Sequence, residues 1–235
     1  MSENYNIFKA LHLEEKELIH SAMIVAIISK NNNRKSFFEM LNECLTNDLN
    51  KTIVKEPSKF RLYDLEESID VKNENNRWID TEVHLLEKFP NSNTTRDRGR
   101  ADIWIGTNKK GATERYRLII ENKINAGNQY RQLRRYYRYL TETKTSEKGI
   151  HREFAGLFFL CVKGDEEDIK KAEESSLPFA TETKRNEKTS YAIITYKDII
   201  RWLEEVIKDT EEGDFKTAVI QYKEIIKGFY PETKE

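Results

Sequence analysis

Nine consecutive residues without a polar side chain, Phe154–Val162 (FAGLFFLCV), constrain the fold of this chain most. The run is much shorter than the roughly 20 residues that a membrane-spanning helix needs. Its density of aromatic and aliphatic side chains predicts the most deeply buried β-strand of the protein. Tyr191–Thr195 predicts a second, shorter strand further along the chain.

Three more strands are predicted before this run. Arg77–Leu86 alternates between apolar and polar residues, as a half-buried strand does. Its apolar face is expected to carry Ile79, Thr81, Val83 and Leu85. Glu82 is expected on the opposite face, either near a functional site or as an exposed carboxylate. Ala101–Ile105 and Tyr116–Ile120 are separated by a polar, glycine-containing loop, so a hairpin is predicted.

Helical periodicity fills most of the remaining sequence, and the asparagine runs at 31–33 and 73–76 are expected to be loops. The predicted helices are Glu14–Ser29, Arg34–Leu49, Asn128–Tyr139, Asp165–Ser175, Asp198–Ile207 and Phe215–Phe229. The element order is therefore α-α-β-β-β-α-β-α-β-α-α. It predicts a mixed α/β fold in which helices flank a mixed sheet. No linker or repeat divides the chain, so a single domain over residues 1–235 is expected.

Composition excludes several classes of protein. Apolar residues make up 37% of the 235 residues and aromatic residues 11%, which is too much for an intrinsically disordered chain. Only Cys44 and Cys161 are present, which excludes a disulfide framework and a cysteine-based zinc site. The first residues, MSENYNIFKA, show no signal peptide. A cytoplasmic location without membrane contact is expected.

Charged residues in two neighbouring apolar strands indicate a candidate functional site. Asp102 lies in the strand Ala101–Ile105, and Leu118-Ile119-Ile120 runs directly into Glu121-Asn122-Lys123. Side chains two apart in a strand share a face, so Glu121 and Lys123 point the same way. If the two strands pair, Asp102 comes beside Glu121.

Two neighbouring carboxylates at a buried strand end are costly unless a cation compensates them. Mg²⁺ suits such a site because it takes oxygen ligands, often one or two carboxylates together with water and a substrate phosphate. Lys123 would then orient or help deprotonate the attacking water, or stabilise the charge of the transition state. The combination predicts metal-dependent hydrolysis of phosphodiester bonds.

These residues resemble the PD-(D/E)XK nuclease superfamily, which has the restriction-endonuclease-like fold. The sequence is more narrowly similar to bacterial families with the motifs IENKI and QLxxY, here Ile120–Ile124 and Gln132–Tyr136. Lys16–Ser21 matches a KExxHS pattern, and Tyr196–Glu204 resembles a strand-to-helix signature of the same group. The core order α-β-β-β-α-β is expected over about 14–162, with an α/β extension over 163–235. Ala101 departs from the nominal pattern, which has proline before the aspartate.

The resemblance implies a role for each matching residue. Asp102 and Glu121 would be metal ligands, Lys123 the catalytic lysine, and the backbone carbonyl of Asn122 a further ligand. Glu17 matches an acidic residue that completes the site in many members, although it could equally serve the dipole of its helix. Gln132 and Tyr136 match positions that flank the active site.

The surroundings of these residues are basic although the net charge of the chain is only −1. Residues 96–138 hold twelve basic and four acidic residues, a net charge of +8, which leaves −9 for the remainder. The tyrosine-rich helix with Arg131 and Arg135 is either a solvated face or a surface for phosphate contacts and base stacking. The expected loop Arg96–Arg100 could extend that surface or become ordered only on binding, and Arg100 is a candidate nucleic-acid contact. The local charge favours a polyanion as partner.

The leading hypothesis is a nuclease that uses Mg²⁺, or Mn²⁺ in its place, to cleave DNA in restriction or phage defence. RNA stays open as a substrate, and a homodimer or a partner subunit stays open as an assembly. The alternatives are a catalytically inactive nucleic-acid-binding module and a regulatory subunit on the same fold.

Overall fold

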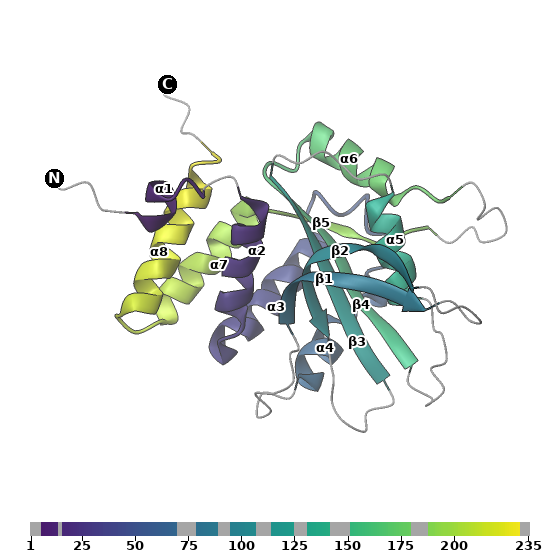
Figure 1. Cartoon of the computed structure of the whole chain (residues 1–235), viewed down its shortest axis with the longest axis horizontal. Coiled ribbons are helices and arrows are strands. Elements are labelled where there is room, and N and C mark those ends of the chain that lie inside the picture. Colours follow the sequence, from purple (N-terminus) through teal and green to yellow (C-terminus); the bar gives the residue numbers. More distant parts are fainter. Residues whose placement is uncertain are drawn as a thin grey trace.

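The computed structural model describes residues 6–13, 16–69, 79–88, 95–106, 114–124, 131–141, 151–179 and 188–230. Its centre is a five-stranded mixed sheet in the order β1-β2-β3-β4-β5. The first three strands are antiparallel, whereas β3, β4 and β5 run parallel (Figure 1). The strands are β1 (Ile79–Lys88), β2 (Thr95–Gly106), β3 (Glu114–Lys123), β4 (His151–Cys161) and β5 (Ala192–Thr195).

Helices cover both faces of this sheet. They are α1 (Ile7–Ala10), α2 (Glu17–Ile28), α3 (Asn31–Thr46), α4 (Leu62–Ser68), α5 (Gln132–Thr141), α6 (Glu166–Ser176), α7 (Tyr196–Asp209) and α8 (Asp214–Lys227), with a 3₁₀ turn, η1 (Pro57–Lys59). The order confirms the predicted mixed α/β fold, and its α-β-β-β-α-β core matches the restriction-endonuclease-like fold. Three short elements, α1, η1 and α4, were not predicted, because each is too short to show a period in the sequence.

Two apolar cores lie on opposite faces of the sheet. The α7-side core joins α2, α3, α4, α7 and α8 to the strand residues Ile103, Ile105, Leu118, Ile120, Phe158 and Leu160. The α5-side core joins α5 and α6 to Ala101, Ile119, Leu157, Phe159, Cys161 and Ile193. The strand β4 contributes to both cores, which confirms the deeply buried strand predicted from FAGLFFLCV.

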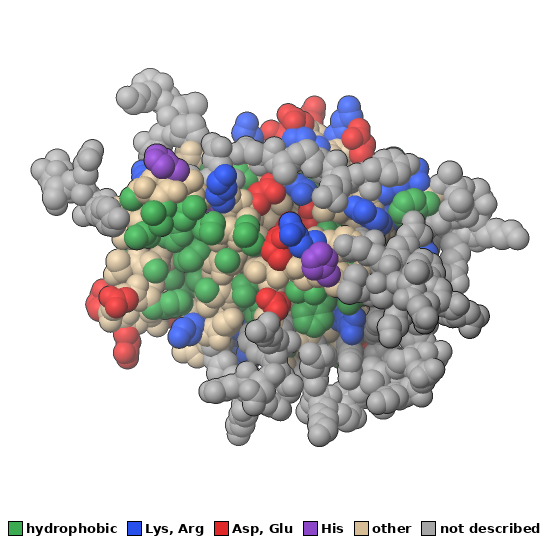
Figure 2. All heavy atoms as spheres, in the orientation of Figure 1, with side chains coloured by type: hydrophobic (Ala, Val, Ile, Leu, Met, Phe, Trp, Pro, Cys, Tyr) green, Lys and Arg blue, Asp and Glu red, His purple; other side chains and the backbone are tan. Residues whose placement is uncertain are grey.

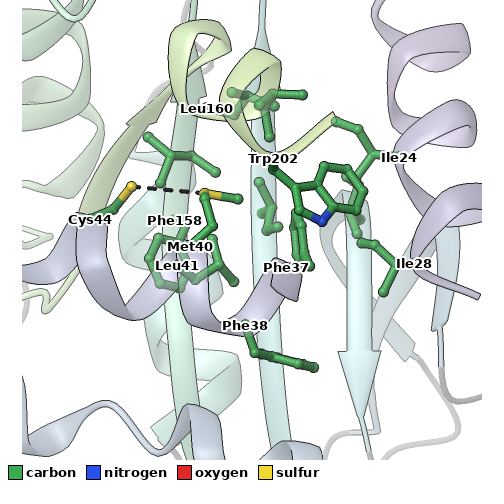
Figure 3. Packing of buried hydrophobic residues seen from close by; sticks show 14 of the residues in the cluster. Ile24, Ile28, Phe37, Phe38, Met40, Leu41, Cys44, Phe158, Leu160 and Trp202 are labelled. Atoms are coloured by element: carbon green, nitrogen blue, oxygen red, sulfur yellow. Dashed lines mark hydrogen bonds between the residues drawn. The ribbon is translucent and has the colours of Figure 1, made fainter. Parts of the chain in front are cut away.

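Aromatic packing fixes α3 and α7 on this sheet. The Trp202 ring of α7 lies 4.8 Å from the Phe37 ring of α3, and both belong to the core that also contains Ile24, Ile28 and Phe158 (Figure 3). The indole nitrogen of Trp202 donates to Ser36 Oγ at 3.1 Å, so its polar atom is satisfied inside the core. Both cysteines are free thiols buried in these cores, as their apolar contexts predicted.

Two segments expected to be loops are regular elements. Asn31–Asn33 form the first turn of α3, where Asn33 is buried and its side-chain amide donates to the Ile27 carbonyl at 3.2 Å. Arg96–Arg100 belong to β2, because the backbone pairs with β1 at Arg96 and Arg100. In both segments, hydrogen bonds to a neighbouring element stabilise a regular structure, although the polar local sequence suggested a loop. The asparagines at 73–76 lie outside the described residues.

The prediction of one apolar face along β1 was wrong. Ile79 packs on the α7-side core, whereas Val83 and Leu85 pack on the α5-side core. The change coincides with Glu82, whose φ of 57° lies in the left-handed region that non-glycine residues rarely adopt. The strand β1 therefore changes the face on which it packs between its register pairs Thr81–Ile103 and Val83–Ala101, at the level of Asp102.

None of the helices that the structure describes is long and apolar enough to cross a membrane.

Candidate active site

The predicted site residues meet where β2 separates from β3. The backbone register of these strands ends at the pair Ile103 and Ile120. Beyond this pair, Asp102 Oδ2 accepts a hydrogen bond from the Asn122 amide at 2.7 Å. A carboxylate thus replaces a backbone carbonyl as the partner of β3 at this point, which we call the fork between the two strands.

Glu121 and Lys123 form a buried ion pair on one face of β3. Lys123 Nζ lies 2.6 Å from Glu121 Oε1, and the two side chains are 11% and 1% exposed. Glu121 Oε2 is also buried and makes no well-formed hydrogen bond with the described residues, although the Tyr136 hydroxyl is close enough to lower the pKa of Glu121. A buried carboxylate with an oxygen left over is costly unless a further donor or cation reaches it.

Burial raises the pKa of both carboxyl groups, and the repulsion between them adds to the rise at Glu121. Burial, and then the charge of Asp102, raises the pKa of Glu121 to about 8. Burial also raises the pKa of Asp102 to about 6, although the Asn122 amide and Lys123 oppose the change. Burial alone would lower the pKa of Lys123, but the surrounding carboxylates, chiefly Glu121, outweigh it and the pKa is raised. The cluster therefore favours a cation beside its acids.

Glu17 lies at the start of α2 and contacts the end of β3. Its Oε1 accepts a hydrogen bond from the Ile124 amide at 2.7 Å, and its backbone carbonyl accepts one from Asn122 Nδ2 at 3.1 Å. Its charge also raises the pKa of Asp102 and of Lys123. The structure thus brings Glu17 to the site, and its role as a ligand remains a prediction.

Glu82 approaches the same site from β1. Its carboxylate pairs with Arg100 on β2, and its charge raises the pKa of Asp102. Of the two alternatives for Glu82, the structure shows the one close to the site. Arg100 is exposed, and its guanidinium lies beside the fork.

Gln132 and Tyr136 of α5 are buried and lie next to the site. Gln132 Nε2 donates to the Tyr136 hydroxyl at 2.8 Å, and that hydroxyl donates to the Arg100 carbonyl at 2.6 Å. Gly99, at a φ of 116°, packs its backbone against the Tyr136 ring, where an added Cβ would lie 3.3 Å from the ring. Gln132 and Tyr136 thus hold β2 beside Glu121 through the hydrogen bond to the Arg100 carbonyl. A contact of Gln132 and Tyr136 with nucleic acid remains a prediction.

The arginines of α5 and Arg131, which directly precedes it, are divided between the interior and the surface. Arg134 is buried, whereas Arg131 and Arg135 are half-buried. The Arg131 guanidinium lies 5.2 Å from the centre of the Phe179 ring, a cation–π contact. Phosphate contacts of Arg131 and Arg135 remain a prediction.

Sequence reasoning missed the polar residues behind β3. The Asn122 side chain points away from Glu121 and meets Ser21 of α2 and Tyr196 of α7, at 3.2 and 2.9 Å. Sequence reasoning assigned only the backbone carbonyl of Asn122. Ser21 and Tyr196 were not predicted as site residues. Both lie in sequence motifs that carry the family resemblance, Lys16–Ser21 and Tyr196–Glu204, and these motifs were the one sequence signal available for them.

The donor set fits a hard divalent cation only in part. Among the described residues, no three His, Cys, Asp or Glu side chains lie close enough together to hold a metal ion. Two carboxylates and a backbone carbonyl suit Mg²⁺, which commonly keeps water and phosphate as its remaining ligands. The unpartnered Glu121 Oε2 is the feature that fits such an ion.

Charged side chains gather over this part of the surface. Figure 2 shows acidic and basic groups between the start of α2 and the strands β1 and β2, while apolar side chains spread over α8 and α2.

Comparison with known proteins identifies the family of this chain. A family model described as PD-(D/E)XK nuclease superfamily matches residues 5–224, which include every candidate site residue named in this subsection. No match was found among curated proteins or among solved structures. Because the match covers nearly the whole sequence, this chain belongs to the PD-(D/E)XK nuclease superfamily.

Proposed function

We propose that this protein is a divalent-metal-dependent nuclease that hydrolyses phosphodiester bonds in DNA. Asp102, Glu121 and the Asn122 carbonyl would hold Mg²⁺, with Mn²⁺ able to replace it, and Glu17 would complete the acidic environment. Lys123 would act as the catalytic lysine. A role in restriction or phage defence in the cytoplasm belongs to the same proposal.

The observation that carries this proposal is the buried Glu121 carboxylate. It has one cation beside it, a second carboxylate close enough to raise its pKa, and an oxygen without a hydrogen bond. A single lysine cannot neutralise two carboxylates, and a cation bound between them would remove the repulsion. When bound, such a metal supplies Lewis acidity and lowers the pKa of its water.

The protein groups provide the remaining chemistry. Lys123 is held by Glu121 and is largely shielded from solvent, so its ammonium group remains charged and in place. In that position it would orient the attacking water or stabilise the negative charge that develops on the phosphate. Arg100 lies at the exposed edge of the fork, where a guanidinium could contact a neighbouring phosphate.

The charge distribution supports a nucleic acid as substrate. The segment 96–138, which contains both strands of the fork and α5, carries +8 against −9 for the remainder. A local positive field around a site raises the rate at which a polyanion reaches it, while the acidic remainder limits binding elsewhere.

The test is cleavage of plasmid and linear DNA, with an RNA substrate in parallel, in Mg²⁺ and in Mn²⁺. Glu121→Gln and Lys123→Ala are expected to reduce the rate by on the order of 100-fold or more. Matched controls are Glu212→Gln and Lys216→Ala, which alter another Glu–Lys pair, 2.8 Å apart, at the exposed start of α8. Cleavage by Glu121→Gln at the rate of the parent would contradict the proposal. DNA binding without any metal-dependent cleavage would instead favour an inactive binding module.

A further inference from the structure

The end of β3 presents opposite faces to two different environments. Glu121 and Lys123 point toward the fork and α5, while the side chain of Asn122 between them points toward α2 and α7. Asn122 is fully buried. Any movement of its backbone therefore moves the two catalytic side chains on either side of it.

The Asn122 carboxamide is held by three hydrogen bonds from two helices. Its Nδ2 donates to the Glu17 carbonyl at 3.1 Å and to Ser21 Oγ at 3.2 Å, and its Oδ1 accepts from the Tyr196 hydroxyl at 2.9 Å. A carbonyl can only accept, so the contact with Glu17 fixes which end of the carboxamide faces α2. The other end must then take its hydrogen bond from a donor on α7.

Tyr196 is that donor, and the fold holds it firmly. It is the first residue of α7, directly after Thr195, whose backbone pairs with Cys161 of β4. Asp198 closes a capping box with Thr195, with a hydrogen bond of 2.8 Å to the Thr195 amide. The Tyr196 hydroxyl is buried, and burial raises its pKa well above the ordinary value, so it stays protonated as a donor.

We propose that Tyr196 is a positioning residue of the metal site, which acts by holding Asn122, and with it Glu121 and the Asn122 carbonyl, in the metal-binding arrangement. This inference rests on the proposed function, because it concerns the same metal site. Without the hydroxyl, Asn122 Oδ1 is a buried acceptor with no partner on α7. The carboxamide then turns or recruits water, and the end of β3 moves.

Tyr196→Phe removes only the hydroxyl, and Tyr222→Phe provides a matched control. Both tyrosines are buried, and each ring centre lies 5.5 Å from the His20 ring centre. The Tyr222 hydroxyl contacts His20, at 3.3 Å from Nδ1, and no hydrogen bond joins it to Asn122 among the described residues. The two variants thus lose the same group from similar surroundings, and only one of them touches β3.

The measurement is the affinity of the full chain for Mn²⁺ in the absence of DNA, by titration calorimetry and by the electron paramagnetic resonance spectrum of the ion. Tyr196→Phe is expected to bind Mn²⁺ about ten-fold or more weakly, as loss of partners that orient metal ligands commonly does. Its kcat for DNA should fall while KM for DNA stays unchanged. Tyr222→Phe should keep the affinity and spectrum of the parent.

Each result decides the inference. Parent-like Mn²⁺ affinity in Tyr196→Phe, equal weakening in Tyr222→Phe, or no Mn²⁺ binding by the parent would overturn it. Weakened Mn²⁺ binding in Tyr196→Phe, with a parent that cleaves no DNA, would support the inference and contradict the proposed function. If Tyr196→Phe does not fold, Asn122→Ala replaces it, because it removes the acceptor of the Tyr196 hydroxyl and keeps the backbone carbonyl. Unchanged Mn²⁺ affinity in that variant overturns the inference.

Discussion

The Asp102 carboxylate accepts a hydrogen bond from the backbone amide of Asn122, just beyond Ile103 and Ile120, the last backbone pair of β2 and β3. The Asp102 carboxyl group therefore continues the hydrogen bonding between β2 and β3 through Oδ2. Its remaining lone pairs face the fork, where the two strands separate. The geometry of the strand ends and the acidity of the site depend on the same side chain.

Asp102→Asn separates these two roles. The amide oxygen of asparagine can still accept from Asn122, so the fork should keep its shape, but the negative charge is gone. We expect DNA cleavage to fall by on the order of 100-fold or more, because a ligand should matter at least as much as the groups that orient it. Stability at pH 8 should not fall, because the variant no longer places a carboxylate beside Glu121. Initial rates on plasmid DNA and urea unfolding measure the two effects, and retention of full activity would show that Asp102 is not a ligand.

The metal-free protein should lose stability as the pH rises from about 4 to about 8. The pKa values of Asp102 and Glu121 are raised in the folded state, to about 6 and about 8, so the folded protein holds protons that the unfolded chain has released. Stability from these groups is complete below the pKa of the unfolded acids and is lost through the folded values, on the order of a few kcal/mol. Urea unfolding in EDTA across this range measures the loss.

Mg²⁺ should oppose that loss, because it binds the ionised carboxylates and so stabilises the folded state more at pH 8 than at pH 5. Glu121→Gln provides the control, with a flatter pH profile and little response to Mg²⁺. A parent protein whose metal-free stability is constant between pH 6 and pH 8 would contradict the assignment of raised pKa values.

Lys123→Met tests the buried ion pair. The substitution leaves Glu121 without its neighbouring cation, and breaking a buried pair from one side commonly costs about 3–5 kcal/mol. We expect a loss of this order at pH 9, and a smaller loss at pH 5.5, where Glu121 can hold a proton. The double variant Glu121→Gln with Lys123→Met should recover most of the lost stability, as denaturant unfolding of all three proteins can show. A double variant less stable than Lys123→Met would disprove the pairing.

Glu82 tests the backbone strain beside the site. Its φ of 57° costs a non-glycine residue about 1–2 kcal/mol, and glycine adopts it freely. Glu82→Gly should therefore be more stable than Glu82→Ala by about 1 kcal/mol, the reverse of the usual order in a strand. Both lose the contact with Arg100, so their comparison isolates the backbone, and thermal unfolding measures it. Equal stability of the two variants would exclude strain at this position.

The sequence predicted the sheet well because its signals there are local. The apolar run of β4 and the alternation of Glu121, Asn122 and Lys123 depend only on neighbours in the chain, and the structure agrees with both. Pairing of the predicted hairpin then brought Asp102 beside Glu121, as the distance along the chain allowed.

The remaining features depend on partners far apart in the chain. The contact of Tyr196 with Asn122 joins residues 74 positions apart, and neither hydrophobic periodicity nor helix or strand propensity indicates it. The switch of β1 between the two cores requires the left-handed backbone of Glu82, which glutamate seldom adopts, so the sequence pattern suggested a regular strand. Asn31–Asn33 are an exception with a nearby partner. Asn33 donates to the buried carbonyl of Ile27, six residues earlier at the end of α2, and this contact outweighs the weak helix propensity of asparagine.

The position of Tyr196 also sets a limit on how far this protein can be shortened. It follows β5, beyond the α-β-β-β-α-β order that defines the core, yet its hydroxyl reaches back to the strand that carries Glu121. A fragment ending at residue 162 would retain the acids, the lysine and four of the five strands, and would lack the group that holds Asn122 from behind. On the proposed role of Tyr196, we expect the smallest unit able to assemble this centre to extend at least through α7.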